Sequence, residues 1–202
     1  PNQKERAKRF SSALRDYLKV IVLDLDPSDE PQAIFETLNA HGTPLLPADL
    51  MKNWLLWEAA RQKADATVLY SEYWRHFDRD HAYWRQTVGT GHAARARVDT
   101  FLQNWLTMTT QEVVSAKHLY DRFLRYTRTL GEDGAIDLHA LMGTVRHFAG
   151  LYETIDQPKG NDRFSRFLER LKVLDVVVFH PLILFIMHAA KGNDKTLTAV
   201  AE

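Results

Sequence analysis

The sequence contains no cysteine among its 202 residues. A chain without cysteine has no disulfide bond, no thiolate zinc site and no cysteine nucleophile. This excludes the disulfide-rich secreted scaffolds and fits a reducing compartment, so a cytoplasmic location is expected.

Neither sign of charge is in excess. The 26 Lys and Arg residues balance the 26 Asp and Glu residues, so no global basic field indicates a nucleic-acid partner. A partner of that kind would have to be bound by a local patch of charge.

Long apolar runs are also missing. The longest one, residues 173–190, is interrupted by two histidines, one aspartate and one proline, and the start of the chain is polar and has no apolar run. Neither a signal peptide nor a transmembrane helix is predicted, and no membrane partner is expected. The chain begins at Pro1 without Met and stops where a helical pattern still runs, so we expect a fragment of a larger protein.

Glycine and proline are scarce, at 9 and 7 residues. They separate segments in which apolar residues recur every three or four positions over windows longer than most strands, which predicts an all-α fold. We expect an irregular multi-helix domain with at most one short strand-like segment, near 20–25. A single helical region over 1–202 is favoured, and two packed helical lobes, 1–88 and 92–202, are the alternative. The predicted helices cover about 3–19, 31–41, 47–65, 66–79, 93–108, 115–130, 137–155, 161–174, 181–191 and 193–202.

An acidic run follows the segment 20–25 and invites an enzymatic interpretation. Asp24 and Asp26 resemble the paired aspartates at the start of haloacid-dehalogenase-type phosphatases. That chemistry also needs a parallel sheet, a magnesium ion and a lysine, and no alternation of strands and helices follows. The phosphatase is kept as a remote alternative to a solvated acidic turn that caps the next helix.

Nine histidines raise the question of a metal site. His76 and His81 are five residues apart, so they do not share one helical face as paired ligands would. We interpret this segment as the end of a surface helix and predict no metal. His180 precedes Pro181 in an apolar run, which indicates a helix-start or core histidine. The tryptophans fall on apolar helical stripes and are predicted to be core residues: Trp54, Trp57, Trp74, Trp84 and Trp105.

Basic residues gather locally despite the neutral total. Arg85, Arg95 and Arg97 crowd the middle of the chain, and the segment 89–97, GTGHAARAR, has the flexibility of a loop that could approach a nucleic-acid backbone. These three arginines are the candidate nucleic-acid contacts. Ordinary solvated helix faces are the alternative interpretation.

The most specific stretch is 34–56, IFETLNAHGTPLLPADLMKNWLL. It resembles the GmrSD-type modification-dependent restriction endonucleases, in the helical region that follows their ParB/sulfiredoxin-like domain. Segments 119–126 and 171–187 are weaker landmarks in the same order. His41 stands where that family usually has Arg, Pro47 replaces a common Ser, and neither the Asp-Gly-Gln-Gln-Arg segment nor the His-Asn-His nuclease domain is present. The matching positions are Phe35, Glu36, Leu38, Asn39, Gly42, Pro44, Leu45, Asp49, Leu50, Lys52 and Asn53.

The resemblance implies a function for the parent protein more than for this stretch. It implies a helical platform of an anti-phage defence protein, coupling a nucleotide-binding N-terminal domain to a DNA-cleaving C-terminal domain. The partners would be those two domains, and DNA and NTP would be bound by the full-length protein, with no cofactor and no catalytic residue here. A stand-alone helical module that binds protein, as in a homo-oligomer, or binds DNA is the alternative.

The motif also has a physical interpretation of its own. Asn39 and Gly42 tolerate left-handed conformations and can turn the chain sharply between two helices. Asp49 and Lys52 are three residues apart on an otherwise apolar helix, which predicts a partly desolvated ion pair. Either this corner fixes the angle between two helices, or it completes a nucleotide pocket. The pocket would use Asn39, Gly42, Thr43, Asp49, Lys52 and Asn53.

Overall fold

The computed structural model describes residues 3–18, 46–89, 91, 94–132, 134–191, 197 and 199. The chain forms two units, residues 1–44 and 45–202. In the first unit, α1 (Gln3–Tyr17) has no buried residue, and its apolar stripe exposes Phe10, Leu14 and Tyr17. The predicted strand-like segment 20–25, with Asp24 and Asp26, lies outside the described residues.

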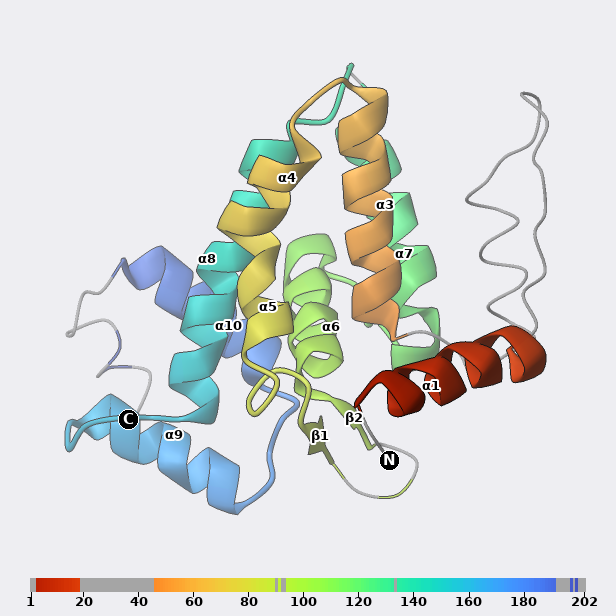
Figure 1. The fold of residues 1–202 in the computed structure, drawn as a ribbon. Coiled ribbons are helices and arrows are strands. Elements are labelled where there is room, and N and C mark those ends of the chain that lie inside the picture. Colours follow the sequence, from red (N-terminus) through yellow and green to blue (C-terminus); the bar gives the residue numbers. More distant parts are fainter. Residues whose placement is uncertain are drawn as a thin grey trace. The chain divides into compact units, whose positions relative to one another are not determined.

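The second unit is built from helices, which confirms the predicted all-α fold class (Figure 1). The β-strands among its described residues form a short antiparallel hairpin, β1 (Thr87–Val88) with β2 (Arg95–Ala96), which was not predicted. The described helices contain none that is both long enough and apolar enough to cross a lipid bilayer. The helical elements are α3 (Pro47–Arg61), α4 (Ala66–Leu69), η1 (Tyr70–Trp74), α5 (Arg75–Arg79), α6 (Arg97–Thr110), η3 (Ala116–His118), α7 (Leu119–Leu130), α8 (Leu138–Asp156), α9 (Arg163–Val173) and α10 (His180–Ala190).

Aspartates begin several of these helices. Asp65, Asp137 and Asp162 precede α4, α8 and α9, and each accepts a hydrogen bond from a backbone N–H of the first turn at 2.9 Å. Such caps satisfy N–H groups that have no partner within the helix. The predicted starts near 66, 137 and 161 are therefore close to the observed ones.

The predicted helix 93–108 begins four residues later, at Arg97, because the preceding residues form the hairpin. Thr87 pairs with Ala96 and Val88 with Arg95. The first two N–H groups of α6 then donate to the carbonyls of Gln86 and Trp84, at 2.9 and 3.0 Å. The hairpin thus caps α6 and holds the preceding turn against it.

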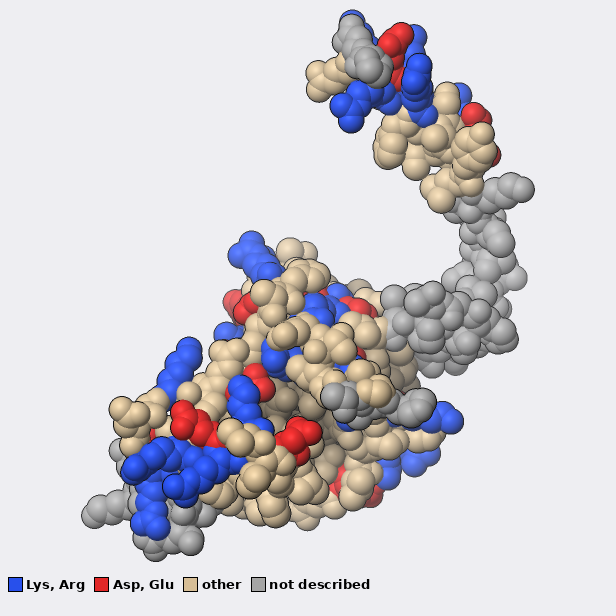
Figure 2. Space-filling view, turned by 90° about the horizontal axis from the view of Figure 1, so that it is seen from below, with Lys and Arg blue, Asp and Glu red and all other residues tan. Residues whose placement is uncertain are grey.

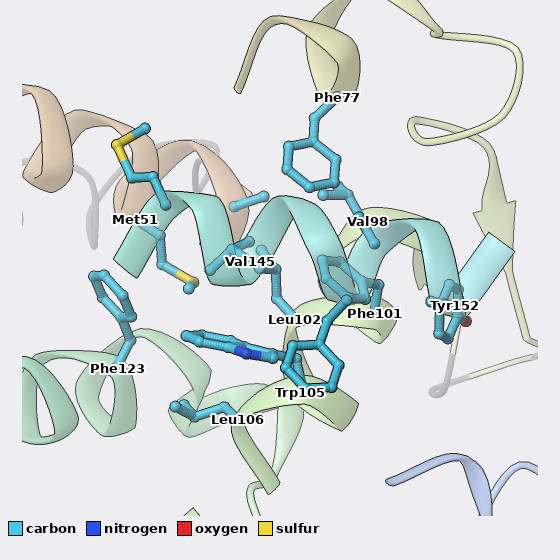
Figure 3. Packing of buried hydrophobic residues seen from close by; sticks show 14 of the residues in the cluster. Met51, Phe77, Val98, Phe101, Leu102, Trp105, Leu106, Phe123, Val145 and Tyr152 are labelled. Carbon is cyan, nitrogen blue, oxygen red and sulfur yellow. The ribbon is translucent and has the colours of Figure 1, made fainter. Parts of the chain in front are cut away.

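The core lies around α6, whose Phe101, Leu102 and Trp105 are fully buried (Figure 3). Aromatic rings meet there edge to face, with 4.9 Å between the ring centroids of Phe77 and Trp84. Figure 1 shows α6 between α8 and α7 in the view, and both helices contact it. Helices from both sides of the 88–92 loop therefore contribute to one core.

The core assignment is correct for three of the tryptophans and wrong for Trp57. Trp74, Trp84 and Trp105 are buried, and Trp54 packs partly buried against the core. Trp57 is 42% exposed. On α3 the buried stripe follows positions 48, 51, 55 and 58, and a residue at 57 is turned away from it.

The interpretation of the segment 76–81 as the end of a surface helix is correct only in part. Helix α5 does end there, at Arg79, and His81 is exposed. His76 instead packs on Phe77, with 3.7 Å between ring centroids, and both of its ring nitrogens are buried without a hydrogen-bond partner. Burial lowers the pKa of His76 to about 4, so this imidazole is neutral at pH 7.

Candidate functional site

Two residues of the 34–56 motif belong to a charged cluster, formed by Asp49 and Lys52 of α3, Asp78 of α5 and Arg85. Lys52 Nζ lies 3.1 Å from Asp49 Oδ1 and 3.0 Å from Asp78 Oδ2. The Arg85 guanidinium donates to both oxygens of Asp49, at 2.8 and 3.0 Å, and to Asp78 Oδ1 at 2.5 Å. Each cation therefore bridges both carboxylates.

The charged cluster is compact and largely shielded from water. Its side chains are between 14% and 22% exposed, and the Tyr70 hydroxyl donates to Asp78 at 3.2 Å. Burial alone would raise the pKa of Asp49, but hydrogen bonds from Arg85 and Lys52 and their charges hold it below its ordinary value. The pKa of Asp78 is lowered by the same two cations against the same effect of burial. Both carboxylates are thus charged at pH 7.

The charged cluster is better suited to holding helices together than to binding an anion. Two positive and two negative groups balance within the charged cluster, so little field is left to attract a phosphate. The contacts join α3 to α5 and to the turn that leads into β1. Because a partly buried ion pair is costly to break on one side only, the charged cluster fixes α3 against these elements.

The sequence predicted half of this cluster. The Asp49–Lys52 pair is present as expected, but Asp78 and Arg85 join it from 26 to 36 residues away, a separation that helical spacing cannot reveal. Asn53 lies half-buried on the same helix. The other candidate pocket residues, Asn39, Gly42 and Thr43, lie outside the described residues.

A buried carboxylate that the sequence did not reveal holds the start of α3. Asp99 of α6 is 3% exposed, and its Oδ1 accepts the Ala48 N–H at 2.9 Å. Burial raises the pKa of Asp99 to about 6, although the Ala48 hydrogen bond favours the charged form. Pro47 opens α3 without a side-chain cap from Leu46, so α6 supplies the cap from a distance of 51 residues.

The three candidate nucleic-acid arginines have different surroundings. Arg85 belongs to the charged cluster. Arg97 is 9% exposed and donates to the Tyr83 carbonyl and the Gln86 side chain, at 2.7 and 2.9 Å, with its guanidinium over the Tyr83 ring. Arg95 is half-buried on β2 and lines, together with Arg97, a cavity of about 440 Å³. The structure therefore brings two of the three together, at a concave site.

His180 begins α10, as the helix-start interpretation predicted. Its ring packs edge-on to Tyr152, with 5.8 Å between centroids, and its Nδ1 is buried without a hydrogen-bond partner. Burial lowers the pKa of His180, so the imidazole is neutral at pH 7. It lines the same cavity as Arg95.

Comparisons with protein-family models, with curated proteins and with solved structures give no match for this chain. The resemblance to the modification-dependent restriction endonucleases therefore stays a prediction that rests on residues 34–56.

Proposed function

We propose that this chain is the helical platform of a cytoplasmic anti-phage restriction protein, set between a nucleotide-binding N-terminal domain and a DNA-cleaving C-terminal domain. The observation that carries the proposal is the charged cluster. The motif on which the resemblance rests uses Asp49 and Lys52 to tie helices together, as a platform requires, and does not leave them free for chemistry.

In the platform role, the segment with Asn39 and Gly42 and the helix α3 that follows it have separate functions. Helix α3 is held at its first turn by Asp99, which accepts from Ala48, and by Arg85, which donates to Asp49. A domain that precedes α3 and changes position with its bound nucleotide would therefore not move α3 alone. It would move α3 together with the elements to which α3 is fixed. In this proposal Asn39, Gly42 and Thr43 contribute to the nucleotide site, while Asp49 and Lys52 keep α3 in place.

The proposal is tested by comparing the chain with the longer protein that the resemblance implies. We expect the longer protein to hydrolyse nucleotide and to cleave modified DNA, and the 202-residue chain to do neither at equal concentration. Hydrolysis or cleavage by the isolated chain would contradict a platform role, as would a longer protein whose DNA cleavage is independent of nucleotide.

An exposed apolar surface favours a second candidate function, a protein-interaction module that forms a homodimer. By apolar surface we mean the exposed apolar residues of the segment 173–185, which are between 49% and 85% exposed: Val173, Leu174, Val177, Val178, Phe179, Leu182 and Phe185. Surfaces of this kind mark interaction sites. Asp175 is the charged residue within this segment, so two copies could meet there with little like-charge repulsion, as a two-fold interface requires.

Light scattering tests this second function. We expect a dimer at micromolar concentration and a monomer for the double variant Leu182→Ser/Phe185→Ser, whose side chains lie outside the core. A monomeric parent chain, or a dimer unaffected by the double variant, would contradict it.

A further inference from the structure

A cavity of about 440 Å³ opens between the β-hairpin, α6, α8, α9 and the start of α10. We call it the hairpin cavity. Its volume lies in the range of small-molecule sites, roughly 300–1,000 Å³. Its apolar wall comes from three different elements, with Ile155 of α8, Leu168 of α9 and Val88 of β1. Figure 2, which views the molecule from below, shows a hollow with basic and acidic side chains around it.

The charges that line the hairpin cavity do not balance. Arg95, Arg97 and Lys172 face two carboxylates, Asp156 and Asp175. Arg97 Nε lies 3.2 Å from Asp156 Oδ2, so these two groups largely neutralise each other. Lys172 Nζ is bonded to the Asp156 carbonyl at 2.5 Å. Within the part of the chain that the structure describes, no ion pair involves Arg95, so the excess positive charge is available there.

The wall also holds a polar atom that lacks a partner. Arg97 Nε and Asp156 Oδ2 face each other as an ion pair at 3.2 Å, whereas the buried His180 Nδ1 has no hydrogen-bond partner. Such an atom is rare and calls for an explanation. Because His180 lines the cavity and its Nδ1 has no partner, this nitrogen can accept a hydrogen bond from a ligand there.

We propose that the hairpin cavity binds a small organic anion with a flat apolar body and an N–H or O–H donor. The anionic group lies at Arg95, the body packs between Ile155 and Leu168, and the donor faces His180. This site is separate from the charged cluster and does not depend on the platform role.

Two probes with the same ring and opposite charge test the proposal. Indole-3-acetate and tryptamine both carry an indole with an N–H donor, one as an anion and the other as a cation. Calorimetric titration of the 202-residue chain at low salt is expected to show saturable binding of indole-3-acetate, about tenfold tighter than tryptamine for one partly shielded charge. The preference should shrink as salt is added.

Matched variants locate the binding. Arg95→Gln is expected to remove the preference for the anion, and Arg79→Gln, at an exposed position on α5, to leave it unchanged. Thr100→Trp fills the cavity from α6 and is expected to abolish binding, whereas Thr144→Trp, on the exposed side of α8, does not. If circular dichroism shows that Thr100→Trp does not fold, the result with Arg95→Gln alone locates the binding.

Three results would overturn the proposal. They are the absence of saturable binding up to millimolar probe, tighter binding of tryptamine than of indole-3-acetate, and binding that survives Arg95→Gln but is lost in Leu182→Ser/Phe185→Ser. The last would assign the probe to the apolar surface.

Discussion

Replacing Arg85 by methionine removes the cation that makes three of the hydrogen bonds in the charged cluster. The variant leaves Asp49 and Asp78 to share Lys52, so the charged cluster changes from neutral to a net charge of minus one. Breaking a buried ion pair on one side costs about 3–5 kcal/mol. These side chains are 14% to 22% exposed, so water offsets part of that cost. We therefore expect Arg85→Met to lower the free energy of unfolding by an amount near the lower end of this range, about 3 kcal/mol.

The double variant Asp49→Asn/Arg85→Met separates charge balance from packing. Removing both partners restores neutrality, because Lys52 then faces Asp78 alone. The double variant should therefore lose about 1–2 kcal/mol less than the sum of the two single variants. Urea denaturation at pH 7, followed by tryptophan fluorescence and circular dichroism, measures all three.

The pH dependence gives a second check on the same variant. The pKa values of Asp49 and Asp78 are lowered in the folded protein. Their stabilisation is therefore present above the unfolded carboxylate pKa of about 3.9 and is lost as the pH falls through the lower folded values. The free energy of unfolding of Arg85→Met should therefore be lower than that of the parent chain at pH 7, and the difference should disappear below pH 4. The control Arg79→Met, at an exposed position on α5, should behave like the parent. An Arg85→Met loss no larger than that of Arg79→Met would refute the structural role of the charged cluster.

Further predictions concern the core and its buried titratable groups. Asp99→Asn keeps an oxygen for the Ala48 N–H and removes a buried charge. The pKa of Asp99 is about 6 in the folded protein and about 3.9 in the unfolded chain. The free energy of unfolding of this variant at pH 8 should therefore exceed that of the parent by up to about 2–3 kcal/mol, and the gain should disappear as the pH falls from 6 to 4. An unchanged pH profile would contradict this. In the same variant, His76, with a folded pKa of about 4, should make stability fall as the pH drops from about 6.5 to 4, and flat denaturation midpoints over that range would count against the buried neutral imidazole. Trp105→Ala should cost about 3–5 kcal/mol in urea denaturation because the ring is fully buried, and a loss below 1 kcal/mol would refute its place in the core.

Local signals in the sequence were sufficient to predict most helices of the described residues. The three- and four-residue apolar spacing acts within one element, so the predicted beginnings of α8 and α9 are close to the observed ones. The predicted helix 31–41 and most of the predicted helix 193–202 lie outside the described residues. The hairpin escaped prediction because Thr87 pairs with Ala96 across a loop whose glycines indicated only flexibility. Trp57 was misassigned because nothing in the local pattern shows that the buried stripe of α3 accepts Glu58 in place of the neighbouring tryptophan.

The candidate site was predictable only where its contacts are local. Asp49 and Lys52 are one helical turn apart, and their ion pair followed from that spacing. Asp78, Arg85 and Asp99 reach α3 through tertiary packing, and no spacing rule links positions so far apart. Arg85 was a candidate nucleic-acid contact, and its ion pairs were not predicted, because a basic residue in a sequence does not reveal the carboxylates that it meets.

Nucleotide affinity of the longer protein carrying Arg85→Met tests the platform account most directly. If the charged cluster holds α3 without touching nucleotide, the dissociation constant should stay within about twofold of the parent value, while nucleotide-stimulated DNA cleavage falls by about tenfold or more because the tie from α3 to the core is weakened. A dissociation constant raised by tenfold in a folded variant would contradict the account and make the charged cluster part of the nucleotide pocket.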